Sequence, residues 1–194
     1  MLTLSRRTVT ALAASLGVYA LLAVSMSAPA AAADDREIAQ ALPTGGLVIV
    51  VRHGATFPDQ ADTDPLNFDN IAAQRNLNDK GKMLARQFGD ALRRAGVPIG
   101  KVYTSKYTEG GLVVSPNENN RRSDAFRKML AAAPKPGTNT ILITHFPNII
   151  AALGKDWFNV KEGQATIFRP ENGSYKLVGR VQMDEWPRIA TAHK

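Results

Sequence analysis

The chain has 194 residues, of which 44% are hydrophobic and 21% are charged, and this suffices for one folded domain with its own core. The composition excludes a disordered or collagen-like chain, and the absence of cysteine excludes disulfide bonds, thiolate zinc sites and cysteine nucleophiles. The 24 Lys and Arg residues exceed the 17 Asp and Glu residues, so the formal net charge is +7 and anionic partners are favoured.

The beginning of the chain, residues 1–33, has the pattern of a bacterial signal peptide. Arg6 and Arg7 precede an uncharged stretch with an apolar centre at 9–24, and a run of alanines ends the segment. The two arginines also resemble the start of a twin-arginine signal. An uncleaved membrane anchor is the alternative, although the apolar stretch is short for a span of about 20 residues. We therefore expect cleavage, a single domain at 34–194 with no stable membrane span, and a periplasmic or secreted location.

The rest of the chain alternates between apolar runs and helical patterns. The run at 47–51 is continuous and rich in β-branched residues, which is typical of a strand buried on both faces. In chain order we expect a strand at 47–51, a long loop at 55–76 with a short helix near 71–73, a helix from Asn78 or Asp79 to about Ala95, a strand at 101–104, a helix from Pro116 to Ala133, a strand at 140–144, a short helix at 148–153, and two strands at 165–168 and 175–181. This alternation predicts an α/β fold, a three-layer sandwich with a mostly parallel central sheet and helices on both faces. The last two strands would form an antiparallel edge.

The helix at Pro116 has the clearest start signal. Ser115 and Glu118 have the spacing of a capping box, and proline occupies the first helical position. Its apolar residues then recur on one face as far as Ala133.

The basic residues after the leader are scattered, with adjacent arginines only at 93–94 and 121–122. No basic stripe with interleaved aromatic residues and no nucleic-acid-binding motif is present, so a solvated basic surface explains the charge and we expect no nucleic-acid partner. The sequence contains no set of histidine and acidic residues with the spacing of metal ligands, such as His-Glu-x-x-His. We therefore expect neither a metal site nor a cofactor.

Two of the three histidines follow directly after predicted buried strands, whereas His193 lies next to the C-terminus. If the two strands are parallel neighbours, His53 and His145 lie at one edge of the sheet, where open α/β sheets bind ligands. For either histidine alone, a structural imidazole with satisfied hydrogen bonds is the alternative. Arg52 offers a planar fork suited to phosphate, and Gly54 permits a close approach of a ligand to the backbone. A neutral imidazole is also a competent nucleophile near neutral pH.

The segment 52–56, Arg-His-Gly-Ala-Thr, follows a hydrophobic strand and resembles the signature of the histidine phosphatase superfamily (phosphoglycerate mutase-like). Three more segments resemble parts of that family in the same order. They are Leu-Asn-Asp-Lys-Gly at 77–81, Val-Tyr-Thr-Ser at 102–105 and Ile-Leu-Ile-Thr-His at 141–145. The resemblance covers most of residues 46–182.

The resemblance implies a phosphomonoester hydrolase that forms a phosphohistidine on His53. Arg52 and His145 would hold the oxygens of the transferring phosphoryl group, and the substrate-binding residues would include Gly54 and Thr56. Glu109 is the candidate for the acid that protonates the leaving oxygen, with an ordinary loop carboxylate as the alternative. The partner would be a small phosphorylated substrate or inorganic phosphate. A mutase of phosphorylated sugar acids is disfavoured, because an exported enzyme would rarely meet those metabolites.

The chain departs from the family after Ser105. Many members carry a second arginine and a helix there, and roughly two dozen residues of that βαβ unit are missing here. Lys106 is an imperfect substitute for that arginine. Arg121 or Arg122 would have to reach the site from the predicted helix, and the alternative is that both lie on its solvent-exposed surface. A weakened or inactive phosphate-binding protein of the same fold is therefore the alternative function. The short connection would also expose sheet surface that a homodimer would cover.

Overall fold

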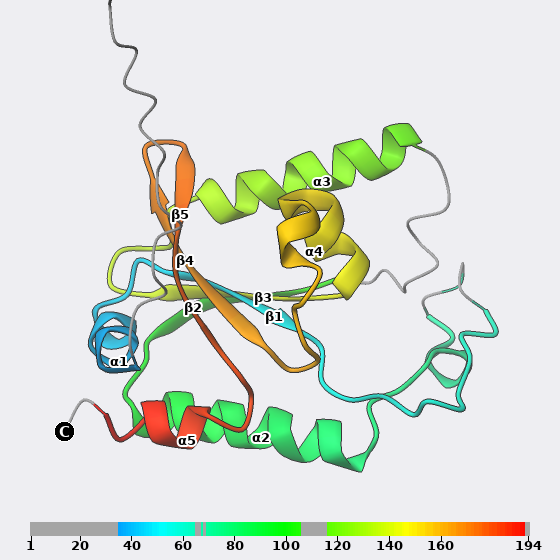
Figure 1. Cartoon of the computed structure of the whole chain (residues 1–194), viewed down its shortest axis with the longest axis horizontal. Helices are drawn as coiled ribbons and strands as arrows, with labels where there is room; N and C mark the ends of the chain where they lie inside the picture. The colour runs from blue at the N-terminus through cyan, green and yellow to red at the C-terminus, as the bar shows by residue number, and fades with distance from the viewer. Residues whose placement is uncertain (1–34, 65–66, 68, 106–115, 193–194) are drawn as a thin grey trace, which may run out of the picture. The chain divides into compact units, whose positions relative to one another are not determined.

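The computed structural model describes residues 35–64, 67, 69–105 and 116–192, which lie within one compact unit, Ala31–Lys194. Helices cover both faces of a central sheet, so the α/β sandwich expected from the sequence is confirmed (Figure 1). The elements are α1 (Asp35–Thr44), β1 (Val48–Arg52), η1 (Ile71–Ala73), α2 (Asp79–Arg94), β2 (Ile99–Thr104), α3 (Pro116–Ala131), β3 (Asn139–Thr144), α4 (Phe146–Leu153), η3 (Lys155–Trp157), β4 (Ala165–Glu171), β5 (Ser174–Val181) and α5 (Trp186–Ile189).

The five strands have the order β2-β3-β1-β4-β5. Strands β1 and β2 each pair in parallel with β3, whereas β4 pairs antiparallel with both β1 and β5. Four strands therefore run in one direction and β4 alone runs against them, which confirms the mostly parallel sheet. Between β4 and β5 the chain turns at Asn172 and Gly173, both with positive φ, as a tight two-residue hairpin turn requires.

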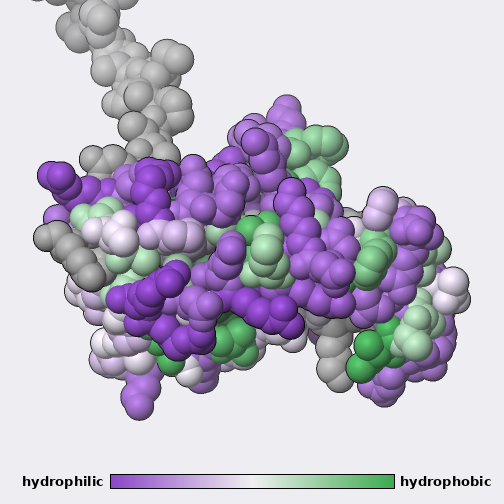
Figure 2. All heavy atoms as spheres, turned by 90° about the horizontal axis from the view of Figure 1, so that it is seen from below, coloured by the Kyte–Doolittle hydropathy of each residue, from purple (hydrophilic) through white to green (hydrophobic). Residues whose placement is uncertain are grey.

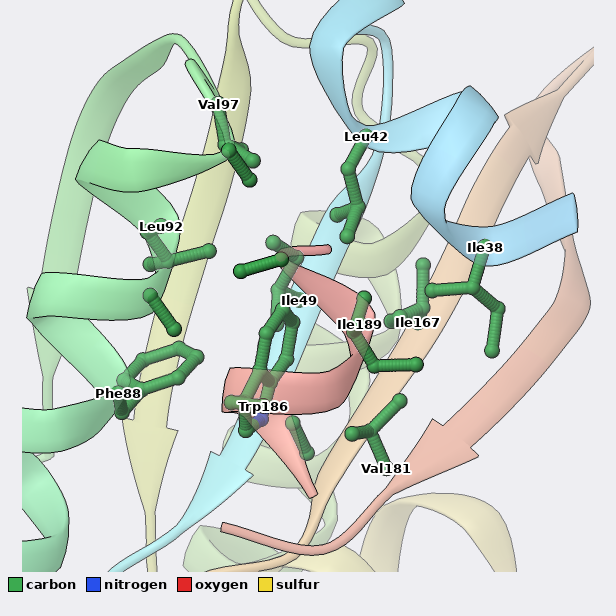
Figure 3. Close-up of a cluster of buried hydrophobic side chains, with 14 of the residues drawn as sticks. Ile38, Leu42, Ile49, Phe88, Leu92, Val97, Ile167, Val181, Trp186 and Ile189 are labelled. Carbon is green, nitrogen blue, oxygen red and sulfur yellow. The ribbon is translucent and has the colours of Figure 1, made fainter. Parts of the chain in front are cut away.

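Strand β1 is buried on both faces because its side chains alternate between two apolar clusters. Ile49 and Val51 contact the layer of α1, α2 and α5, whereas Val48 and Val50 contact the layer of α3 and α4. Figure 3 shows the first cluster, in which Trp186 of α5 lies against Phe88 of α2. The labelled members are Ile38, Leu42, Ile49, Phe88, Leu92, Val97, Ile167, Val181, Trp186 and Ile189. The second cluster contains Val48, Val50, Leu130, Leu142, Ile149, Val160 and Phe168.

One buried polar side chain ties the beginning of the sheet together. Asn139, the first residue of β3, is 0% exposed. Its Oδ1 accepts a hydrogen bond from the backbone N of Leu47 at 3.1 Å, and its Nδ2 donates to the carbonyls of Leu42 at 2.8 Å and Pro98 at 3.1 Å. These contacts link backbone groups at the end of α1 and near the starts of β1 and β2. The backbone N of Leu47 depends on Asn139 for its acceptor, whereas the Leu42 and Pro98 carbonyls also accept from backbone N–H groups.

Several boundaries differ from those expected. Helix α4 begins at Phe146 rather than at Asn148, because Pro147 favours the first turn and His145 with its extended backbone already serves as the N-cap. Asn78 is the N-cap of α2, as predicted, and its side chain accepts a hydrogen bond from the N of Gly81 at 2.9 Å. Helices α1 and α5 were not expected from the sequence.

Strand β2 lies at an open edge of the sheet. Val102 and Tyr103 are 55% and 42% exposed there. Helices α2 and α5, which lie on the face of the sheet opposite α3 and α4, present a mainly hydrophilic outer surface (Figure 2). Within the described residues, no helix is long and apolar enough to cross a membrane.

Candidate functional site

The two histidines that follow β1 and β3 lie side by side. The parallel register places Arg52 opposite Thr144, and the backbone N of His53 donates to the carbonyl of Thr144 at 3.0 Å. The imidazole rings of His53 and His145 are tilted by 58°, with centroids 5.0 Å apart. Both residues are half-buried. The placement of these two side chains at one sheet edge, expected from the sequence, is therefore observed.

A hydrogen bond fixes which nitrogen of His53 can react. Nδ1 of His53 lies 2.9 Å from the carbonyl oxygen of Gly54. A carbonyl can only accept, so Nδ1 carries the proton of the neutral imidazole and the lone pair belongs to Nε2. Nε2 is therefore the ring nitrogen whose lone pair is not used in this contact.

The guanidinium of Arg52 is held on the side of the sheet covered by α4. Nη1 donates to the carbonyl of Val160 at 2.8 Å, Nη2 lies 3.7 Å from the carboxylate of Glu162, and the group stacks 4.9 Å from the ring centroid of Phe146. Nε is buried and has no hydrogen-bond partner among the described residues. A buried donor without an acceptor is energetically costly, so this N–H is an unusual feature of the site.

A turn before β4 closes the site from the side, and sequence reasoning missed it. The backbone N of Gly163 lies 3.1 Å from the carbonyl of Arg52 and 3.0 Å from that of His53. Gly163 has φ +73, a conformation that side chains rarely adopt. Its signal in the sequence was a glycine between polar residues directly before a strand.

The glycine of the Arg-His-Gly segment has a packing role. A Cβ at Gly54 would lie 3.2 Å from Cα of Gly81, and a Cβ at Gly81 would lie 2.2 Å from the carbonyl oxygen of Ala55. The chain after His53 therefore touches the first turn of α2 so closely that both positions need glycine. This contact is a physical reason for the glycine at the end of the segment 77–81, which is part of the family resemblance.

Thr56 lies one step further along the same segment. It forms an isolated antiparallel bridge with Leu77, and its carbonyl accepts a hydrogen bond from Nδ2 of Asn78 at 2.8 Å. Glu109 and Lys106 lie outside the described residues. Among the residues that the structure does describe, no three His, Asp or Glu side chains are grouped so that they could hold a metal ion.

Asn148 in the first turn of α4 links two strand ends, and sequence reasoning missed this link too. Its Nδ2 lies 3.0 Å from Oγ1 of Thr144 and 3.3 Å from Oγ of Ser105. The backbone N of Ser105 in turn donates to the carbonyl of Ile143 at 2.9 Å. The ends of β2 and β3 and the start of α4 are therefore fixed to one another beside His145.

A cavity of about 400 Å³ begins at these strand ends and extends over β2 and β3 beside α3. Arg121 and Arg122 both line it, so the structure places them at this cavity rather than only on the solvent side of α3. The full lining is Tyr103, Thr104, Ser105, Arg121, Arg122, Ser123, Ala125, Phe126, Met129, Leu142, Ile143, Thr144 and Asn148.

No protein-family profile matches the chain, and no curated protein sequence matches it. Among solved structures it is similar to a protein described as the phosphohistidine phosphatase SixA from Agrobacterium tumefaciens, with 17% identity, a TM-score of 0.42, and coverage of 70% of this chain and 97% of that one. It is also similar to a mutant of phosphoserine phosphatase from Entamoeba histolytica in complex with phosphoserine, with 10% identity, a TM-score of 0.42, and coverage of 71% and 97%.

Proposed function

We propose that the chain is a phosphomonoester hydrolase that works through a phosphohistidine on His53. The observation that carries the proposal is the convergence of His53 and His145, with Arg52 adjoining His53, at the carboxyl edge of parallel strands. Ligands of open α/β sheets bind at this edge. A nucleophile with its lone pair on Nε2, beside two groups that can donate to phosphate oxygens, suits phosphoryl transfer.

The reaction has two displacements at phosphorus. In the first, Nε2 of His53 forms a bond to phosphorus while the bond to the ester oxygen breaks, and that oxygen leaves with a proton from an acid, for which Glu109 is the candidate; the attacking water of the second step returns a proton to that acid. In the second, water attacks phosphorus, the bond to Nε2 breaks, and inorganic phosphate leaves with the imidazole restored. Arg52 and a protonated His145 would stabilise the charge on the equatorial oxygens during both steps.

Two features of the chain support the reaction without a rearrangement of the site. The hydrogen bond from Nδ1 of His53 to the Gly54 carbonyl persists through both displacements, because only Nε2 changes its bonding. The Arg52 guanidinium is already fixed by the Val160 carbonyl and the Phe146 ring. Groups that are oriented before the substrate arrives lower the barrier more than groups that must be ordered during the reaction.

The test compares the full chain with its His53→Ala variant in the hydrolysis of p-nitrophenyl phosphate at acidic and neutral pH. The matched control is His193→Ala, which removes the histidine next to the C-terminus. We expect turnover in the wild type and the control, and none in His53→Ala. Equal rates for the wild type and His53→Ala would contradict the proposal.

The non-catalytic alternative is tested with the same proteins. A phosphate-binding protein would show a rise in melting temperature with millimolar phosphate, lost in Arg52→Ala, but no turnover of any ester. The leader-like pattern of residues 1–33 supports an activity outside the cytoplasm, and mass spectrometry of the protein secreted by a bacterial host would show whether that segment is removed.

A further inference from the structure

The cavity over β2 and β3 is separate from the groups assigned to the phosphoryl chemistry. Its floor is apolar, with Phe126 and Met129 of α3 facing Leu142 of β3. Helix α3 packs mainly against α4, β4 and β5, and the cavity lies beside it. Its volume of about 400 Å³ falls within the range of small-molecule sites, roughly 300–1,000 Å³.

The cavity adjoins the histidine edge, although the two histidines do not line it. Thr144, one of its lining residues, directly precedes His145, and its carbonyl accepts the hydrogen bond from the backbone N of His53. Asn148, another lining residue, belongs to the helix whose N-cap is His145. Figure 1 shows the first turn of α3 at the end of the sheet where β1 continues into residues 55–76. A group bonded to phosphorus at the histidines can therefore extend into the cavity.

Among the described residues, the charged side chains near the rim of the cavity are Glu118, Arg121 and Arg122. Oε1 of Glu118 accepts hydrogen bonds from Nη2 of Arg121 at 2.7 Å and from Nε of Arg122 at 2.8 Å. These bonds hold the pKa of the Glu118 carboxyl at about 2, so the cluster combines one negative and two positive charges near neutral pH. Arg122 is the more enclosed of the two arginines, with its side chain 20% exposed against 73% for Arg121.

We propose that this cavity binds the leaving group of the substrate, and that Arg122 binds a negatively charged substituent on it. The substrate class is then a phosphomonoester whose organic part is apolar, of small-molecule size, and carries a second anionic group such as a carboxylate. The inference rests on the proposed function, because it takes phosphorus to be bound at His53. It gives Arg122 a role in specificity rather than in the chemical step.

The experiment measures binding by calorimetry, so it does not depend on turnover. The ligands are inorganic phosphate, benzylphosphonate and 4-carboxybenzylphosphonate, whose phosphorus–carbon bonds are not hydrolysed. We expect the carboxylate to tighten binding of the benzyl ligand about tenfold in the wild type, as a charge-assisted hydrogen bond would. In Arg122→Gln that gain should disappear. The matched control is Arg93→Gln on α2, where Arg93 also pairs with a carboxylate three residues away, that of Asp90.

A second variant tests the apolar floor. Met129→Trp reduces the space in the cavity, and we expect the ratio of the Kd of benzylphosphonate to that of phosphate to rise at least about tenfold. Met83→Trp is the control, because Met83 is an exposed methionine on α2, in the opposite layer. Circular dichroism of each variant verifies the fold.

Each outcome decides the inference. A carboxylate gain that is absent in the wild type, or that survives in Arg122→Gln, overturns the role of Arg122, and an unchanged ratio in Met129→Trp overturns the cavity as the leaving-group site. If inorganic phosphate does not bind either, the proposed function falls and the inference falls with it. The expected binding pattern without turnover would support the inference and contradict only the hydrolytic reaction.

Discussion

Because Gly81 lies in close contact with the chain after His53, we expect its substitution to have a different effect from substitution of Gly89 in the same helix. A Cβ at Gly81 would lie 2.2 Å from the carbonyl oxygen of Ala55, whereas the nearest atom to a Cβ at Gly89 is the flexible Nη1 of Arg93 at 3.7 Å. Real Cβ contacts stay above 3.0 Å, so in Gly81→Ala the two backbone segments must separate by at least 0.8 Å. In Gly89→Ala nothing must move.

The two substitutions are expected to change the free energy of unfolding in opposite directions. Overpacking of this kind costs roughly 1–3 kcal/mol, so Gly81→Ala is destabilised. Gly89→Ala is stabilised by about 1 kcal/mol, because alanine has the higher helix propensity and the unfolded chain loses freedom. The two variants should therefore differ by about 2–4 kcal/mol in the free energy of unfolding, measured by urea denaturation.

The same displacement affects the site. Ala55 follows Gly54, whose carbonyl orients Nδ1 of His53, so a shift of the segment turns the imidazole away from phosphorus. A misplacement of about 1 Å can lower turnover on the order of a hundredfold, and we expect such a fall in Gly81→Ala and none in Gly89→Ala. Equal stability and equal p-nitrophenyl phosphate turnover in the two variants would refute the reasoning.

Three further predictions concern single side chains. Asn139→Ala should lower the free energy of unfolding by about 1–3 kcal/mol, seen as a lower urea midpoint, because the buried backbone N of Leu47 loses its acceptor while the Leu42 and Pro98 carbonyls keep backbone donors. The Glu118 pKa is lowered from 4.5 to about 2 by its arginine partners, so its stabilising effect is complete above 4.5 and lost as the pH falls through 2. Unfolding curves of Glu118→Gln and the wild type should accordingly differ at neutral pH and converge in acid. Arg52→Lys should reduce turnover about a hundredfold, since one ammonium cannot bond the Val160 carbonyl and also present an oriented donor to phosphate.

The central strands and the histidine pair were predictable because their signals are local. Continuous β-branched runs identify β1 and β3, and a polar residue directly after each run must lie at the end of the strand. Parallel pairing of the two strands then brings His53 and His145 together, and this can be predicted without knowing the structure of the loops. Gly54 was predicted to let a ligand approach, whereas the structure shows that it also permits the approach of α2.

The elements that were missed have short or ambiguous signals. Helix α1 buries only Ile38, Ala39 and Leu42 and contains Pro43, and it follows directly on the alanine run of the leader-like segment. Helix α5 has four residues, fewer than two turns, so no period can be read from it. Both are stable because they cover the sheet, and a sequence window does not contain that contact.

The polar links around the site were missed for a different reason. Asn148 stands near a helix start, where asparagine is expected as a cap, and its contact with Ser105 crosses 43 positions of the chain. Glu118 had the spacing of a capping-box partner for Ser115, which lies outside the described residues, yet its carboxylate bonds Arg121 and Arg122 on the same helix face. The cavity likewise depends on where α3 packs, which the sequence pattern does not determine.

The surroundings of Arg52 bear on how the proposed site would bind phosphate. The guanidinium has five N–H donors, and the Val160 carbonyl and the Phe146 ring fix its plane, while Nε has no acceptor within the part of the chain that the structure describes. A phosphate oxygen that binds there meets a group that has already lost its rotational freedom, so the association free energy is not spent on ordering it. Glu162 opposes the anion only weakly, because its carboxylate is 42% exposed and 3.7 Å away, where water and salt screen the charge. Preorganisation of Arg52 is therefore the main contribution that we expect this residue to make to phosphate binding at the proposed site.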